Sequence, residues 1–184
     1  VEPDHVYVSP PGSNLAMLNG TLHLMDVADS RAGKPGANTP LQLPIDGFLR
    51  SLAEDQGERA VCIILSGTGT DGTLGLNAVK AQSGLAIVQD PASAKYGGMP
   101  CSAVATGLAD YVTPPREMPR HLVAYANAPY LATADSTVEI PKGPLQKIFL
   151  LLRTRTGHDF SSYKPTTIRR RIERRMNVHQ IDDP

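Results

Sequence analysis

The stretch that decides the fold is VCIILSGTGTDGTLG, residues 61–75. Its first five residues are apolar, and they lead directly into a glycine-rich turn that carries one carboxylate, Asp71. Helical periodicity begins at Leu74, so the order predicts a strand, a tight loop and a helix. Open α/β sheets place their chemistry in the crevice at the C-terminal ends of their strands. Asp71 is therefore a candidate orienting acid or ligand holder.

Two other readings of this loop stay open at the level of the residues. Gly67 and Gly69 could cradle an anion at a helix N-terminus, although no Gly-Lys-Ser/Thr follows as in a phosphate-binding P-loop. Alternatively, Asp71 simply caps the helix that follows it. A phosphate- or nucleotide-binding α/β domain is thus a weaker hypothesis for the same loop.

The composition predicts a cytoplasmic protein without a metal site. The sequence holds no run of 18 apolar residues that would predict a membrane span. Its first residues lack the basic and apolar regions of a secretory signal. Cys62 and Cys101 stand far apart without metal-ligand spacing, which indicates reduced, mostly buried thiols.

Charge divides the chain into two parts although the net charge is zero. Residues 142–184 hold ten Lys and Arg against four Asp and Glu, a balance of +6. Residues 1–141 hold the other eight basic and fourteen acidic groups, a balance of −6. This asymmetry predicts two modules with different tasks.

Patterning in the first module favours an α/β fold with a doubly wound, mostly parallel sheet. Asn19-Gly20 between two apolar-rich arms predicts a type I′ β-hairpin. A helix is expected from Pro44 to Gly57, a buried strand over Leu85 to Gln89, a small-residue helix near Ala103 to Ala105, a short strand at Tyr111-Val112 and a helix over Met118 to Ala126. Strands that alternate with helices at this spacing are typical of parallel sheets covered on both faces.

The second module is expected to be helical. Residues 127–143 have no apolar period and predict a linker. The first helix after it has an apolar stripe at Leu145, Ile148, Phe149 and Leu152. A second helix should begin near Thr166 or Thr167, where a hydroxyl can cap it. Because two such helices cannot bury a core by themselves, they predict the start of a truncated all-α domain.

The first module resembles the catalytic domain of the chemotaxis protein-glutamate methylesterases, the CheB family. The resemblance covers residues 1–126 and is carried by four segments: VYVSPPGS at 6–13, LPIDGFLRSLAE at 43–54, ILSGTGTDGTLGL at 64–76 and IVQDPASAKYGGMPCSAVATGLADYV at 87–112. The run LLLRTRTGHDFSSYKPTTIRRRIERRM at 150–176 is similar to the N-terminal helical domain of the CheR methyltransferases, within residues 144–184. Both together resemble a fragment of the CheB–CheR fusion proteins of bacterial signalling.

This resemblance implies a serine hydrolase that removes methyl groups from glutamate methyl esters on chemoreceptors. In that family a serine attacks the ester, a histidine accepts its proton and an aspartate orients the imidazole. Asp71 matches that aspartate, and the backbone N–H of Thr68 is implied as an oxyanion donor. The esterase needs no cofactor, and S-adenosylmethionine belongs to a methyltransferase domain that this chain lacks.

The sequence departs from the family in one respect. The family serine and histidine lie on strand–loop segments that precede VYVSPPG, so the resemblance places them before Val1 and the N-terminal strands of the sheet are missing. No Gly-x-Ser-x-Gly stretch occurs in the printed sequence. The expectation is that this chain alone is inactive. The alternative in another class is a non-catalytic receptor-binding module.

The arginines of the second module suit an acidic partner. Guanidinium groups pair well with carboxylates, and the resemblance implies that this region faces the glutamate-bearing cytoplasmic helices of chemoreceptors, in a pathway that can include a histidine kinase. Nucleic acid is the rival partner, disfavoured by the acidic first module; no membrane insertion is expected. The receptor-contacting candidates are Arg169, Arg170, Arg171, Arg174 and Arg175.

Overall fold

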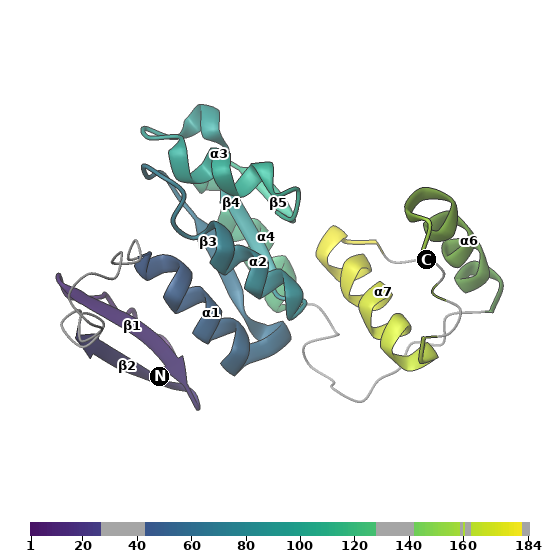
Figure 1. Cartoon of the computed structure of the whole chain (residues 1–184), viewed down its shortest axis with the longest axis horizontal. Coiled ribbons are helices and arrows are strands. Elements are labelled where there is room, and N and C mark those ends of the chain that lie inside the picture. Colours follow the sequence, from purple (N-terminus) through teal and green to yellow (C-terminus); the bar gives the residue numbers. More distant parts are fainter. Residues whose placement is uncertain (27–42, 128–141, 159, 161–162, 182–184) are drawn as a thin grey trace, which may run out of the picture. The chain divides into compact units, whose positions relative to one another are not determined.

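The computed structural model describes residues 1–26, 43–127, 142–158, 160 and 163–181 (Figure 1). The chain divides into two compact units, Val1–Met118 and Pro119–Pro184. The predicted loop over residues 28–40 and most of the predicted linker lie outside the described residues. None of the described helices is long and apolar enough to cross a membrane.

The N-terminal elements of the first unit form the predicted hairpin. Strands β1 (Ser13–Leu18) and β2 (Thr21–Asp26) pair antiparallel, with Leu18 opposite Thr21. Asn19 and Gly20 have φ values of 51° and 72°. A type I′ turn requires positive φ at both central positions, so the hairpin prediction is confirmed.

A three-stranded parallel sheet follows, in the order β3-β4-β5. Its strands are β3 (Val61–Ile64), β4 (Leu85–Gln89) and β5 (Tyr111–Thr113). The register aligns Ile63 with Ile87 and Ile87 with Tyr111. All five residues of β4 are buried, as expected for the central strand of a parallel sheet.

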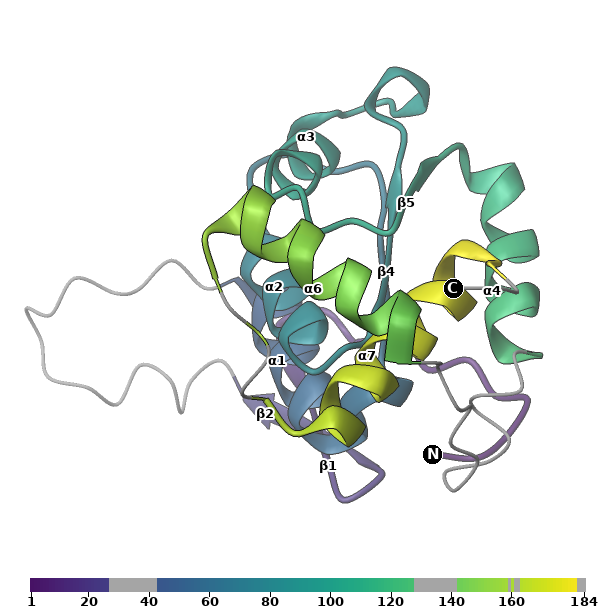
Figure 2. The same ribbon diagram turned by 90° about the vertical axis from the view of Figure 1, so that its right-hand side faces the viewer.

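Helices α1 (Pro44–Gln56) and α2 (Thr73–Ala81) cover one face of this sheet (Figures 1 and 2). Side chains of Cys62, Ile64, Ala86 and Val88 point to that face and form the core with Leu76. The helices of the first unit are α1 (Pro44–Gln56), α2 (Thr73–Ala81) and α3 (Gly98–Ala105), with short 3-10 turns η2 (Gly57–Arg59), η3 (Pro91–Ser93) and η4 (Pro115–Glu117).

A buried ion pair holds α2 to the segment that leads into β5. Lys80 Nζ lies 2.6 Å from Asp110 Oδ2, and the two side chains are 7% and 0% exposed. Lys80 also donates to the Gly84 carbonyl, and Asp110 accepts the Ala86 N–H at 2.9 Å. The pair therefore fastens the helix, the start of β4 and the approach to β5 at one point.

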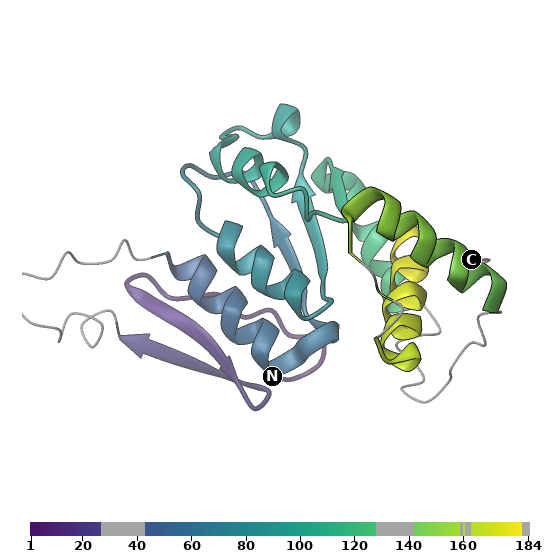
Figure 3. The ribbon, with the colours of Figure 1, turned by 45° about the vertical axis from the view of Figure 1, so that its right-hand side comes forward.

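The second unit contains helices α6 (Lys142–Thr156) and α7 (Pro165–His179), which Figure 3 shows as neighbours. Helix α4 (Met118–Ala126) begins at the boundary residue of the first unit and lies otherwise in the second. The predicted hydroxyl cap of α7 is wrong, because the helix begins one residue earlier with Pro165 and its N-cap is Lys164, which makes no side-chain cap. Proline is favoured at this first helical position since its missing N–H would have no partner there.

Candidate active site

Asp71 stands in the loop between β3 and α2 and is half-buried. Its Oδ2 atom accepts the N–H of Ile45 at 3.1 Å, and Oδ1 accepts those of Asp46 and Gly72, both at 2.9 Å. Ile45 and Asp46 belong to the first turn of α1. The helix that Asp71 caps is therefore α1, which lies 25 residues earlier in the sequence, and not the helix that directly follows it.

The carboxylate of Asp71 keeps room for one more donor. A carboxylate offers about four lone-pair positions, and three backbone N–H groups use two of those on Oδ1 and one on Oδ2. The remaining position belongs to Oδ2, and no donor among the described residues takes it. An imidazole N–H is a donor of the kind that such a position can accept.

The loop around Thr68 is held by the turn that precedes α3. The Gly67 N–H donates to the Tyr96 carbonyl, and the Met99 N–H donates to the Gly67 carbonyl, both at 2.9 Å. Thr68 itself is exposed, and among the described residues no backbone carbonyl accepts its N–H. Its N–H is thus available on a loop whose preceding residue is fixed on both sides.

Gln89 adjoins the candidate site, and the sequence reasoning missed it. It is 5% exposed at the end of β4, and its Oε1 atom accepts the Ser66 N–H at 2.8 Å. Its Nε2 atom donates to the Ser93 carbonyl at 3.1 Å. A polar residue that ends a wholly apolar strand is the signal that could have identified it.

Asp46 is the second missed residue. It is 3% exposed, and its Oδ1 atom accepts the N–H of Gly75 in α2 at 2.7 Å. Its Oδ2 atom is buried with no hydrogen-bond partner in the described part of the chain. An acidic residue directly after Pro-Ile at a predicted helix start was the available signal.

No three His, Cys, Asp or Glu side chains among the described residues gather into a group that could hold a metal ion. The two cysteines differ, since Cys62 is buried in the core and Cys101 is exposed on α3. Burial raises the pKa of the Cys62 thiol to about 12.

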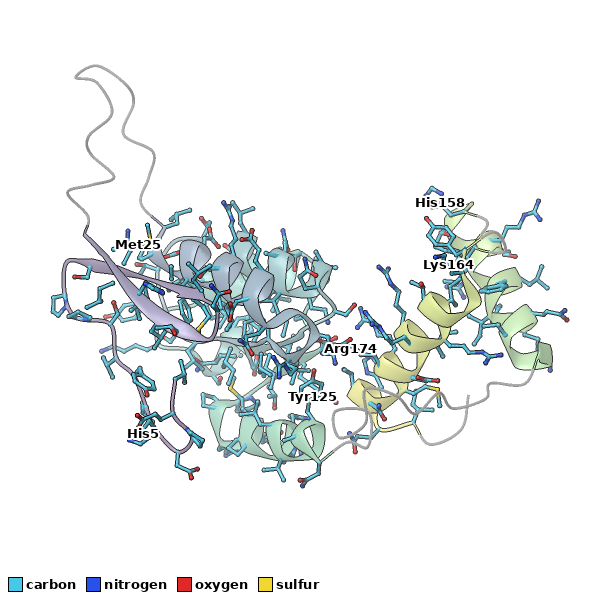
Figure 4. All side chains as sticks on the ribbon, turned by 90° about the horizontal axis from the view of Figure 1, so that it is seen from below. His5, Met25, Tyr125, His158, Lys164 and Arg174 are labelled. Carbon is cyan, nitrogen blue, oxygen red and sulfur yellow. The ribbon has the colours of Figure 1, made fainter. Side chains whose placement is uncertain are left out.

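The five arginines of α7 have different surroundings. Arg174 is 4% exposed and donates to the Tyr125 hydroxyl; its guanidinium lies 5.0 Å from the centre of the Tyr125 ring. Figure 4 shows these two side chains directed toward each other. Arg169 is half-buried, whereas Arg170, Arg171 and Arg175 are exposed. Three of the five candidates are thus open on the surface of the second unit, and Arg174 packs against α4.

An apolar groove of about 450 Å³ lies between α6 and α7 in the second unit. Ile148 and Leu152 of α6 face Ile168, Ile172 and Met176 of α7 across it. Arg171 and Arg175 also line the groove, so basic groups border its apolar wall.

Two protein-family models match this chain, one in its N-terminal part and one in its C-terminal part. The model of the CheB methylesterase family matches residues 1–122, and that of the CheR methyltransferase all-alpha domain matches residues 144–184. The crystal structure of the CheB methylesterase catalytic domain of Thermotoga maritima is similar with a TM-score of 0.51 and 30% identity, covering 64% of this chain and 60% of that one.

Curated relatives extend the likeness. An uncharacterized 104.1 kDa protein of Rhodobacter capsulatus is 35% identical over 98% of this chain and 20% of its own length. A protein-glutamate methylesterase/protein-glutamine glutaminase of Paraburkholderia xenovorans is 34% identical over 67% of this chain and 33% of its own length, and one of Moorella thermoacetica is 39% identical over 50% and 22%. This chain thus spans between a fifth and a third of the length of these relatives.

Fold, loop geometry and family matches agree with one another. The loop that holds Asp71 and Thr68 follows the C-terminal end of a strand of a parallel sheet, the edge at which open α/β sheets bind their ligands. The chain belongs to the CheB methylesterase family and continues into a CheR-type all-alpha domain.

Proposed function

We propose that the chain contributes the aspartate and an oxyanion donor of a protein-glutamate methylesterase that acts on chemoreceptors, joined to a protein-glutamate methyltransferase. The observation that carries this proposal is the acceptor position on Asp71 Oδ2 that no N–H of the described residues takes, three residues after the exposed Thr68, whose N–H no backbone carbonyl of the described residues accepts. One group orients a histidine and the other binds the oxygen that becomes negative during acyl transfer.

The reaction in this proposal is acyl transfer through a serine. The serine Oγ attacks the carbonyl carbon of the glutamate methyl ester while a histidine takes its proton, and the carbonyl oxygen becomes an oxyanion near the Thr68 N–H. The histidine then gives the proton to the leaving oxygen, methanol departs, and water hydrolyses the acyl-enzyme by the reverse roles. Asp71 holds the imidazole in the required tautomer and stabilises its positive charge.

The serine and histidine of this mechanism are not among the printed residues, which hold no Gly-x-Ser-x-Gly stretch. The chain by itself is therefore expected to hydrolyse no ester. The full-length gene product is expected to release methanol from a methylated receptor. The test compares the two with the same substrate, and hydrolysis by the chain above a substrate-only blank would contradict the mechanism.

Asp71→Asn in the full-length gene product separates catalysis from capping. The amide presents the wrong group to the imidazole, so kcat should fall roughly 10⁴-fold, as for triad aspartates in general. Asp55→Asn is the matched control, because Asp55 also accepts a backbone N–H from another element, that of Gly20. If Asp71→Asn keeps its activity, Asp71 is not the aspartate of the mechanism; if the wild-type full-length gene product hydrolyses no ester, the first unit serves as a non-catalytic receptor-binding module.

We also propose that the exposed arginines of α7 bind the acidic cytoplasmic helices of chemoreceptors, in the cytoplasm and within a histidine-kinase pathway. Exchange of Arg170, Arg171 and Arg175 for Glu should weaken binding of a Glu-rich receptor peptide and flatten its salt dependence. Lys147→Glu on α6, also an exposed position, is the control. Binding of duplex DNA that weakens steeply with salt, without binding of the peptide, would favour nucleic acid as the partner instead.

No cofactor is proposed for the esterase; S-adenosylmethionine is proposed for the methyltransferase part alone.

A further inference from the structure

Helices α1 and α2 exchange N-terminal caps: a carboxylate just before α2 caps α1, and a carboxylate in α1 caps α2. Asp71, two residues before α2, accepts the N–H groups of Ile45 and Asp46 in the first turn of α1. Asp46, in the first turn of α1, accepts the N–H of Gly75 in the first turn of α2 at 2.7 Å. Figure 3 shows the two helices side by side. The carboxylate that accepts the first N–H groups of one helix thus lies in, or directly before, the other helix.

Neither helix caps itself in the usual way. The N-cap of α1 is Leu43 and that of α2 is Gly72, and neither makes a side-chain cap. The first N–H groups of a helix have no partner within the helix, and the positive end of the helix dipole favours a nearby carboxylate. Asp71 and Asp46 meet both requirements from outside the helix that each one serves.

The close contact of the two helices depends on Gly75. A Cβ atom at this position would lie 2.5 Å from Leu49 Cβ and 3.2 Å from Asp46 Cα. Such distances are too short for any side chain unless α1 moves away. Only with glycine here does the Asp46 carboxylate come within hydrogen-bond distance of the Gly75 N–H.

We propose that Asp46 is a positioning residue for Asp71, which rests on the proposed role of Asp71 in ester hydrolysis. The Asp46 carboxylate fixes the first turn of α1 against α2, and this places the Ile45 and Asp46 N–H groups on the Asp71 carboxylate. Because backbone N–H groups occupy three of the four lone-pair positions of the Asp71 carboxylate, the carboxylate cannot rotate freely. Its fourth position, on Oδ2, therefore points in one fixed direction. Asp46 touches neither substrate nor histidine in this scheme and acts through Asp71 alone.

Hydrogen exchange in the chain itself tests the geometry without any assay of activity. Asp46→Ala removes the acceptor of the Gly75 N–H, so protection of the amides at positions 45 and 46 should fall roughly tenfold along with that of Gly75. Asp46→Asn keeps a carbonyl oxygen for Gly75 and should restore most of the protection. Asp55→Ala removes a comparable cross-element bond at the other end of α1 and should leave positions 45 and 46 unchanged. A loss confined to Gly75 in Asp46→Ala would overturn the proposal.

Kinetics of the full-length gene product test the consequence for catalysis. A misplaced aspartate should lower kcat of Asp46→Ala roughly tenfold to a hundredfold with KM unchanged, and Asp46→Asn should recover most of the rate. Unchanged kcat in Asp46→Ala would overturn the positioning role. If the wild-type gene product hydrolyses no methyl ester at all, the proposed function fails, while the exchange experiment still decides whether Asp46 places Asp71.

Discussion

At the residue scale, the two thiols show how strongly surroundings determine chemistry. Cys62 points into the core between the sheet and its helices, and burial raises its pKa to about 12, with Asp110 adding to the increase and Lys80 opposing it. Cys101 is exposed on α3. The sequence expectation of mostly buried thiols therefore holds for Cys62 and is wrong for Cys101. Since the thiolate is the reactive form of cysteine, the two thiols should also differ in reactivity.

Alkylation should therefore label Cys101 alone in the folded protein at pH 8, and both thiols after unfolding.

The raised pKa of Cys62 also predicts how stability changes at alkaline pH. The unfolded thiol ionises above about pH 9 while the folded one stays protonated, so Cys62 contributes stability below pH 9 that is lost as pH rises toward 12. At pH 11 the loss should reach about 3 kcal/mol. In Cys62→Ala this part of the pH slope should be absent, and an identical slope in both proteins would contradict the assignment.

Two adjacent glycines at the start of α3, the N-cap Gly97 and the first helical residue Gly98, allow a matched test of loop packing. A Cβ on Gly98 would lie 2.8 Å from the backbone nitrogen of Gly69, whereas a Cβ on Gly97 would meet nothing closer than 3.7 Å. Gly98→Ala should therefore cost about 1–3 kcal/mol through overpacking against the Thr68 loop. Gly97→Ala should stay within about 0.5 kcal/mol of the wild type. Denaturant midpoints measure both, and equal effects would show that the loop moves freely.

At the scale of elements, the buried pair of Lys80 and Asp110 joins α2 to β4 and to the segment before β5. Asp110→Ala leaves the Lys80 charge buried without this carboxylate and should cost about 3–5 kcal/mol. Adding Lys80→Met removes that charge and should recover part of the loss. The pair of the exposed Arg116 and the half-buried Glu117, 3.9 Å apart, is the control, and Arg116→Ala should change stability by less than about 0.5 kcal/mol. A double variant as unstable as the sum of the single ones would contradict this account.

Local sequence signals predicted the helices and strands well, but they could not predict contacts between residues that are distant in the sequence. Asn19-Gly20 predicted the hairpin because its turn needs positive φ at two adjacent residues, and Gly57 ended α1 as expected with a φ of 57°. The prediction for α3 began too late, since the helix includes Gly98 to Pro100, and Pro100 is buried within its first turn. The sequence predicted Asp71 as a site residue, but it could not predict that Asp71 caps a helix that begins 27 positions before it. No window of neighbouring residues contains that information, and the same holds for Asp46 with Gly75 and for Gln89 with Ser66.

At the scale of the whole molecule, the chain divides into two compact units, Val1–Met118 and Pro119–Pro184. We expect two unfolding transitions in calorimetry, because compact units with their own cores unfold independently unless a large interface couples them. Asp110→Ala should lower the temperature of one transition only. Tyr125→Phe removes the hydroxyl that accepts from Arg174 in the second unit, and it should lower the other by the equivalent of about 1.5–3 kcal/mol. Movement of both transitions by either variant would show that the units are coupled.

The strand β3 stands at one end of the sheet order among the described strands. Its outward side therefore presents backbone groups without a ladder partner from those strands, beside Ile63 and Leu65, which are 38% and 47% exposed. An apolar margin of this kind is a template onto which a strand of another chain can add. A single lysine at position 63 would interrupt that template, and it offers the simplest way to keep concentrated solutions of the protein clear for spectroscopy.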